Sequence, residues 1–297
     1  MSSSELGPGT PLVLNGFLIS KLRWLLLTTI GSASSLSVLL RYANPERVFF
    51  NDLPSLLAFG AEKESECEMN EIGLFEAMYS ARALRRFKTD PVPEELLTRV
   101  LDAAIRAPSA GNAQNWAFIV VRDPEQRRSL GAIYRRASDI VAQFYAARGH
   151  PSHMSEEQYR RLMSSGSYLW SHMDEAPVLL VPCLKLEALP SVPASVVPLD
   201  MQAKYQELRI NRLSGASIYP AIQNIILACR AFGLGTLITT NHTLLEEEVR
   251  SVLALPPAMR TYALMPIGYP RDNFGPLSRL PVTEVACADR YGNAWPG

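Results

Sequence analysis

The sequence predicts a domain that combines α-helices with β-strands, preceded by an N-terminal segment of different character. Apolar residues recur three and four positions apart in residues 94–106 and 217–232, which is the periodicity of helices with a buried face. Short apolar runs at residues 117–121 and 177–182 are typical of buried strands. The chain has 297 residues, which is enough for one large domain or two small ones.

Composition and charge are those of a globular protein with a sizeable core. Hydrophobic residues make up 47% of the chain and charged residues 20%. Lys plus Arg equals Asp plus Glu, so no general nucleic-acid-binding surface is expected. The cysteines lie far apart without C-x-x-C spacing, which indicates reduced thiols. For His150 and His153 a solvated loop is favoured over a metal-binding pair, because no carboxylate or thiol cluster accompanies them.

Residues 1–68 do not resemble the remainder of the chain. Residues 12–40 are apolar, but the uncharged stretch 24–40 is short for a membrane span and contains serines, threonines and a glycine. Three interpretations stay open: a membrane anchor, a signal-peptide core flanked by Lys21 and Arg23, and a segment outside the working protein. Membrane contact through residues 12–40 is not favoured. We expect a cytoplasmic protein, with anchoring through residues 24–40 as the alternative.

A short helix is predicted over residues 74–84, and three arginines, Arg82, Arg85 and Arg86, cluster at its end. Since residues three and four positions apart share a helical face, Arg82 can act with Arg85 or Arg86. A guanidinium group is planar, permanently charged and matched to phosphate oxygens. The cluster therefore predicts an anion clamp, with a solvated basic helix end as the alternative.

The helix over residues 94–106 follows two prolines and begins with two glutamates, as first turns often do. A connection of roughly ten residues, 107–116, leads from it to the next strand, which is long for its type. The connection contains Pro108, Gly111 and three side-chain amides. Such a loop exposes backbone N–H groups and can approach a flat polar ligand, although an ordinary turn has the same composition.

These two stretches together resemble the FMN-dependent nitroreductase family. That family begins with R-x-x-R-x-F and D-P-V-P, continues with a helix, and then has A-P-S-x-x-N-x-Q-x-W. The chain matches these motifs in type, order and spacing at residues 82–87, 90–93 and 107–116. The resemblance covers residues 71–285, which is most of the chain.

The resemblance implies an α+β fold, in which a mixed, mostly antiparallel sheet is flanked by helices. It also implies a homodimer with FMN between the subunits. Residues 69–297 would then form the FMN-binding domain and residues 1–68 an extension. The apolar helix 217–232 would lie at the centre of the dimer. Its ending, Phe232-Gly-Leu-Gly235, is not a dinucleotide fingerprint, because the glycines follow a helix and precede a strand.

The resemblance also implies the residues that contact FMN. Arg82 and Arg279 would hold the phosphate, and Arg85 would lie near the N1/O2 edge of the ring. Thr240, at the end of a strand predicted over residues 236–240, would lie near N5. The family often has a second Arg and a Ser where this chain has Ala81 and Ala83, so only a backbone contact of Ala83 is expected. The full predicted set is Arg82, Ala83, Arg85, Pro108, Ser109, Asn112, Ile238, Thr239, Thr240 and Arg279, with Pro108, Ser109 and Asn112 supplied by the other subunit.

The remaining elements are predicted from their patterns. Residues 125–148 form one long helix that is polar on one side, and residues 246–253 form a short helix. Residues 262–270 form a strand and a turn. Residues 150–175 are predicted to be irregular and polar, and resemble the lid that covers the flavin in the family. Residues 186–200 are a Pro-rich loop.

The implied function is that of an FMN-dependent oxidoreductase. NAD(P)H would be the electron donor, and nitroaromatic, quinone or related small aromatic molecules would be the acceptors. Residues 233–284 resemble the iodotyrosine deiodinase branch, so reductive dehalogenation is the alternative. Glu156, Glu157, Tyr159 and Lys185 are the candidates for the substrate-binding set of that branch. A flavin-binding protein without turnover is the third interpretation.

Overall fold

The computed structural model describes residues 72–186 and 190–296. Contacts divide the chain into two units, Met1–Met69 and Asn70–Gly297, and the described residues all belong to the second. The predictions for residues 1–68, including the candidate membrane segment 24–40, therefore lie outside the described residues, and the domain boundary at residue 68 stays a prediction. Within the described part of the chain, no helix is both long enough and apolar enough to cross a membrane.

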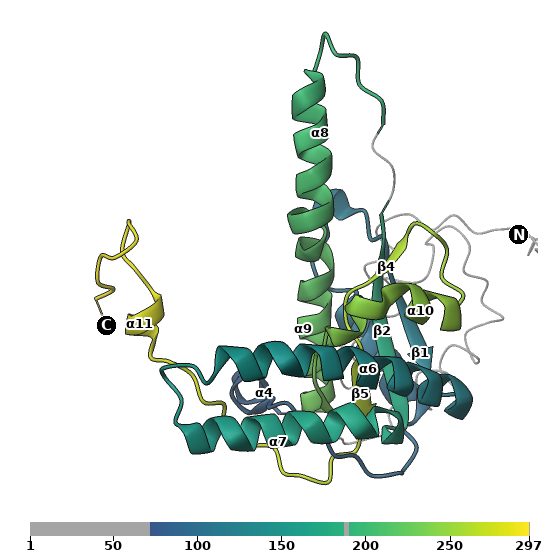
Figure 1. Ribbon diagram of the computed structural model, residues 1–297, viewed down its shortest axis with the longest axis vertical. Coiled ribbons are helices and arrows are strands. Elements are labelled where there is room, and N and C mark those ends of the chain that lie inside the picture. Colours follow the sequence, from purple (N-terminus) through teal and green to yellow (C-terminus); the bar gives the residue numbers. More distant parts are fainter. Residues whose placement is uncertain (1–71, 187–189, 297) are drawn as a thin grey trace, which may run out of the picture. The chain divides into compact units, whose positions relative to one another are not determined.

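A five-stranded antiparallel sheet organises the domain (Figure 1). Strand β2, Val178–Lys185, pairs with β1, Trp116–Val121, along one edge. Along its other edge it pairs with β4, Met259–Thr261, and β5, Met265–Gly268. The two-residue strand β3, Gly235–Thr236, pairs with β5. The predicted α+β class and the predicted antiparallel sheet are confirmed.

Side chains of β2 alternate between two hydrophobic clusters, one on each face of the sheet. Leu180 and Leu184 belong to one cluster, and Leu179, Val181 and Cys183 belong to the other. Seven of its eight residues are buried, because helices cover both faces. This strand is predicted correctly, and it extends three residues further than the apolar run alone indicates.

The helices that cover the sheet fall into two groups, one for each cluster. Helices α5, Glu94–Ala104, and α9, Gly215–Ala231, supply the first cluster. Helices α6, Pro124–Arg148, α7, Glu156–His172, and α10, Glu246–Val252, supply the second. The predictions for α5, α6 and α10 are confirmed to within a few residues.

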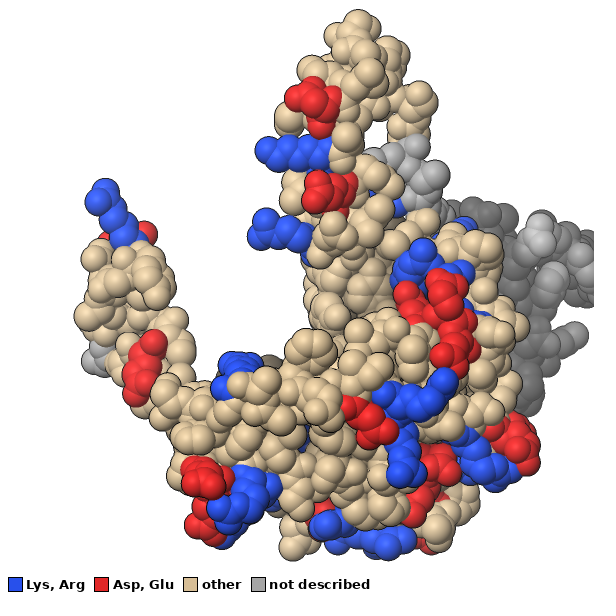
Figure 2. Space-filling view, in the orientation of Figure 1, with Lys and Arg blue, Asp and Glu red and all other residues tan. Residues whose placement is uncertain are grey.

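On the face shown in Figure 2, basic and acidic side chains are interspersed.

The helix predicted over residues 74–84 is shorter than expected. Helix α4, Leu74–Ser80, ends before the arginines. The next residues are extended because they pair with the sheet: the Leu84 N–H donates to the Thr236 carbonyl at 3.4 Å, and the Lys88 N–H donates to the Tyr269 carbonyl at 2.8 Å. The prediction that Arg82 and Arg85 share a helical face is therefore wrong.

Two glycines allow this extended segment to lie close to the sheet. A Cβ atom at Gly235 would lie 3.2–3.3 Å from atoms of Pro270, Leu84 and Phe87. A Cβ atom at Gly268 would lie 3.3 Å from Phe87 Cδ1 of that segment, and only 2.7 Å from Pro177 Cδ. Gly235 therefore serves close packing between backbone segments, which is one of the roles of glycine in a strand.

Three further predictions are corrected by the structure. The region 150–175, predicted to be irregular, contains α7, which begins with a capping box between Ser155 and Gln158. Strand β3 stops at Thr236, and Thr239 makes only an isolated bridge to Leu264. The helix predicted over residues 217–232 is α9, which begins at Gly215, so Pro220 lies inside it.

Helix α9 is preceded by helical structure that the sequence patterns do not predict. Helix α8, Leu199–Leu208, leads through a π-helical segment, Arg209–Leu213, into α9. Figure 1 shows these segments as one rod that extends beyond the sheet. The remaining elements are short: the 3-10 turns Ala110–Asn112, Met173–Glu175 and Asn241–Leu245, and the single-turn helix α11, Val282–Val285, near the C-terminus.

Candidate flavin site

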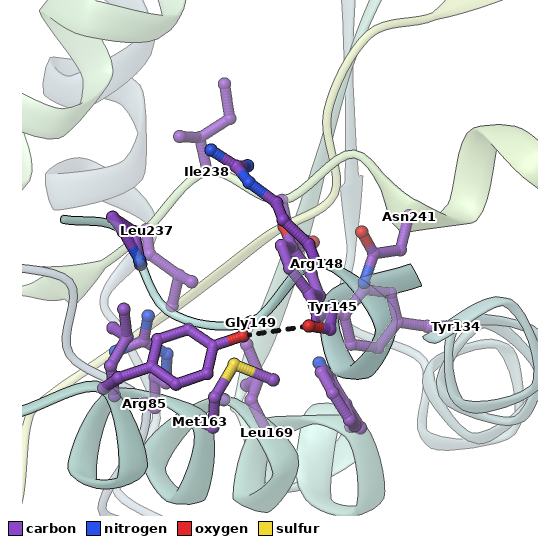
Figure 3. A pocket seen from close by; sticks show the side chains of 16 residues that line it. Arg85, Tyr134, Tyr145, Arg148, Gly149, Met163, Leu169, Leu237, Ile238 and Asn241 are labelled. Atoms are coloured by element: carbon purple, nitrogen blue, oxygen red, sulfur yellow. Dashed lines mark hydrogen bonds between the residues drawn. The ribbon is translucent and has the colours of Figure 1, made fainter. Parts of the chain in front are cut away.

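A cavity of about 270 Å³ lies between α6, α7 and the segment that follows β3 (Figure 3). Its walls are aromatic and apolar, and they include Tyr134, Tyr145, Tyr159 and Trp170. Two arginines, Arg85 and Arg148, line it, whereas no Asp or Glu does. The cavity is therefore suited to a flat ligand that carries negative charge.

Arg85 is the cation that the fold places deepest in this cavity. Its Nη1 atom donates to Ser165 Oγ on α7 at 3.3 Å and to the Ala83 carbonyl at 3.4 Å. Burial lowers the pKa of Arg85, and the nearby charge of Arg82 lowers it further, whereas Tyr134 raises it. A guanidinium remains protonated under all ordinary conditions. Since none of the ion pairs among the described residues involves Arg85, its charge is available to a ligand.

A hydrogen-bonded network holds the segment after β3 against α6. The Thr239 hydroxyl donates to Tyr134 Oη at 3.0 Å, and Asn241 Nδ2 donates to Ser138 Oγ at 3.0 Å. Tyr134 is buried, and burial raises the pKa of its phenol. Because the Thr239 hydroxyl already donates its hydrogen to Tyr134, its oxygen can only accept a hydrogen bond from a bound ligand.

Comparison with known proteins decides the family. The family model described as "Nitroreductase family" matches residues 79–269. The chain belongs to the nitroreductase family. The predicted family is confirmed, and membership places this chain among oxidoreductases.

Individual relatives agree with this assignment. A Thermus thermophilus protein named NADH dehydrogenase is 32% identical over 225 residues, covering 70% of this chain and 92% of the relative. Rat iodotyrosine deiodinase 1 is 25% identical over 207 residues, covering 70% of this chain and 65% of the relative. A solved structure of oxidized iodotyrosine deiodinase bound to FMN and 3-iodo-L-tyrosine is 21% identical, has a TM-score of 0.53 and covers 74% of this chain and 100% of that chain. At that identity, the last comparison supports the fold alone.

Part of the predicted contact set meets at the cavity of this nitroreductase-family chain. Arg85, Ile238 and Thr239 line it directly. Arg82 is exposed, but it lies close enough to Arg85 to lower that residue's pKa. Thr240 and Ala83 are exposed, and neither is among the lining residues; the Thr240 carbonyl accepts from the Thr243 N–H at 3.0 Å, at the start of a 3-10 turn.

The other predicted contacts lie elsewhere on the chain. Pro108, Ser109 and Asn112 belong to a loop that is attached to α9, where the Ala110 N–H donates to Ser217 Oγ at 3.1 Å. Arg279 is exposed near the C-terminus, and its Nη1 donates to the neighbouring Ser278 carbonyl at 2.7 Å. None of these residues lines the cavity of its own chain. Their predicted roles stay predictions.

The cavity also contains residues that the sequence analysis missed, namely Tyr134, Tyr145, Arg148 and Asn241. Tyr134, Ala137 and Ser138 are buried on one face of α6, at the helical spacing of three and four residues. This spacing could have indicated the buried face of α6, but most residues of the helix are polar, and the pattern is therefore weak. No local pattern marks Asn241, because its place at the cavity depends on its contact with Ser138 of α6, which is distant in sequence.

The candidate deiodinase set does not assemble at the cavity. Glu156 and Glu157 form ion pairs with arginines one turn further along α7, and only Tyr159 lines the cavity. Lys185 lies at the exposed end of β2. Among the described residues, no three or more His, Cys, Asp or Glu side chains gather as a metal site requires.

Proposed function

We propose that this chain binds FMN at the cavity and uses NAD(P)H to reduce small aromatic acceptors such as nitro compounds and quinones. The observation that carries the proposal is the half-buried Arg85 guanidinium, which lacks an acidic partner among the described residues and lies between aromatic walls. FMN combines a flat conjugated ring with an anionic phosphate, so the donor set present in the cavity fits it.

FMN, when bound, supplies the hydride and electron transfer between donor and acceptor. The residues of the chain position it and adjust its electrostatics. Arg85 supports negative charge that develops on the ring, and the exposed Arg82 beside it binds the phosphate. Thr239 offers a hydrogen-bond acceptor at the ring edge. Tyr134 fixes the orientation of the Thr239 hydroxyl through their 3.0 Å hydrogen bond.

The test of this proposal uses the purified full chain. We expect it to be yellow, to release FMN and not FAD on denaturation, and to lose its flavin colour with NADH or NADPH in the absence of oxygen. Addition of 4-nitrobenzamide or a quinone should restore the colour. A colourless protein that does not take up FMN would reject the proposal. Loss of colour without recovery would indicate a flavoprotein that accepts electrons from NAD(P)H but does not pass them to these acceptors.

We further propose that the protein works as a homodimer. Pro108, Ser109 and Asn112 do not line the cavity of their own chain. If they contact FMN as the family resemblance implies, a second chain would bring them to a shared site. Exposed apolar side chains on the rod formed by α8 and α9 provide a contact surface, since Leu199 is 70% and Tyr205 51% exposed. The apolar side chains of α9 itself are mostly buried within the subunit. The proposed contact between subunits therefore lies mainly on α8, and less on α9 than the family resemblance implies.

Light scattering at micromolar concentration should therefore give the mass of two chains. A double variant, Leu199→Glu and Tyr205→Glu, should give a monomer, because two charges would have to be buried in the contact. Ile140→Glu, at a 47% exposed apolar position on α6, is the matched control and should remain a dimer. A wild-type monomer that retains FMN would contradict the proposal.

A further inference from the structure

We propose that Arg148 makes the cavity select aromatic acceptors that carry a negative charge, such as aromatic carboxylates. The inference rests on the proposed function, because it concerns the acceptor that the bound cofactor reduces. It goes further by naming the chemical class of that acceptor and the residue that recognises it.

The charged side chains that line the cavity are all positive. Its lining contains two arginines and no carboxylate, although the chain as a whole carries equal numbers of acids and bases. Figure 3 draws the Arg85 and Arg148 side chains apart from each other. If Arg85 serves the cofactor, Arg148 remains as a second positive charge, and an anionic ligand is its natural complement.

Arg148 differs from most of the other arginines on the same two helices because it has no acidic partner among the described residues, and it differs from the likewise unpaired Arg135 because it lines the cavity. Arg136 on α6 pairs with Glu248, and on α7 Arg160 pairs with Glu156 and Arg161 with Glu157. Among the described residues, Arg148 takes part in no ion pair or hydrogen bond with another residue. The internal pairs leave those other charges neutralised, whereas Arg148 presents an uncompensated charge.

Arg148 is the last residue of α6. The chain turns directly after it at Gly149, where φ is 72°. The Tyr159 hydroxyl donates to the Tyr145 carbonyl at 3.3 Å, the dashed line in Figure 3, and this bond ties α7 to the end of α6. The end of α6 is thus anchored at the cavity while the Arg148 side chain stays exposed to an entering ligand.

The cavity walls beside Arg148 can bind the aromatic ring of the ligand, while Arg148 binds its anionic group. Leu162, Met163 and Trp170 of α7 line the cavity and offer apolar and aromatic contact to a flat ring. A planar guanidinium binds a carboxylate through two parallel hydrogen bonds. The site as a whole therefore matches a ring held by α7 with an anionic substituent directed to the end of α6.

For 4-nitrobenzoate, the balanced two-electron reaction consumes one NAD(P)H and one proton. It yields 4-nitrosobenzoate, NAD(P)⁺ and water, with one N–O bond of the nitro group broken and its nitrogen reduced. The carboxylate takes no part in the chemistry. It serves only for binding, so binding can be measured without turnover.

The test compares 4-nitrobenzoate with the neutral 4-nitrobenzamide, by calorimetric titration of the oxidised, FMN-loaded full chain without donor. Wild type should bind the carboxylate more tightly. Arg148→Gln should lower the ratio of the two affinities roughly five- to tenfold, because an exposed charged hydrogen bond is lost. Arg135→Gln, at an exposed arginine of α6 that does not line the cavity, is the matched control and should keep the wild-type ratio.

Two results would overturn the inference. One is that the wild type binds the two compounds equally, or that Arg148→Gln keeps the wild-type preference for the carboxylate. The other is an effect of Arg148→Gln confined to anaerobic reduction by NADPH and not by NADH, which would assign the arginine to the donor's phosphate. If FMN binds and is reduced but no charge preference exists, only this inference fails. If FMN does not bind, the proposed function fails with it.

Discussion

An Arg85→Ala variant is expected to bind FMN roughly ten- to hundredfold more weakly than the wild type, because a charge-assisted hydrogen bond contributes about 1.5–3 kcal/mol. Arg85 is half-buried, and its Nη1 contacts Ser165 Oγ and the Ala83 carbonyl, so its side chain is already directed into the cavity region. Solvent screens it less than a surface arginine. Fluorescence titration of the flavin-free protein with FMN measures the change directly.

The neighbouring Arg86 is the matched control for this prediction. It is exposed, its guanidinium carbon lies 4.7 Å from the centre of the Tyr168 ring, and its Nη1 is 4.0 Å from Asp272 Oδ1. It does not line the cavity. Arg86→Ala should therefore change FMN affinity by less than about twofold, as expected for surface charges. Equal FMN affinity in Arg85→Ala and wild type would remove the observation on which the proposed function rests.

The free energy of unfolding is expected to decrease as the pH falls from about 7 to 4, and His242 should account for much of the decrease. His242 is fully buried, and its Nε2 lies 3.2 Å from Thr261 Oγ1. The Thr261 hydroxyl donates to Glu246 Oε1 at 3.0 Å, so its oxygen must accept from the His242 Nε2–H. Among the residues that the structure describes, the buried Nδ1 has no partner, and a second proton there would find no acceptor.

The sign of the effect follows from the two pKa values. Burial lowers the pKa of His242 to about 4, whereas an unfolded histidine titrates near 6.5. Below pH ~6.5 the unfolded state binds a proton that the folded state does not, so stability decreases until the pH reaches ~4 and then levels off. A difference of about 2.5 pKa units corresponds to roughly 3 kcal/mol.

Urea unfolding at several pH values between about 7.5 and 4.5 measures this dependence. His242→Gln should be less stable at neutral pH, but should lose less stability on acidification than the wild type. His153→Gln, in an exposed loop, is the control and should keep the wild-type slope. Equal slopes for wild type and His242→Gln would show that other groups cause the acid sensitivity.

The sequence by itself determined the family and the elements whose signals are local. The motifs at residues 82–87 and 107–116 were sufficient to predict the nitroreductase family, which the family model confirms. Helices α5 and α6 and strand β2 were predictable because hydrophobic periodicity reports a buried face directly. Helix α7 also carried a local signal, since Ser155 and Gln158 have the spacing of a capping box, and it should have been predicted.

Only the tertiary structure decided how the arginines are presented and which residues form the cavity. Arg82 and Arg85 leave the helical path because the backbone around Leu84 and Lys88 bonds to Thr236 and Tyr269, far along the chain. Tyr134, Arg148 and Thr239 meet through the packing of α6 against the segment after β3. Pairing between segments so distant in sequence depends on the whole sheet being formed, and no local pattern encodes it. The motif therefore identified the arginines, while the sheet determined where their charges lie.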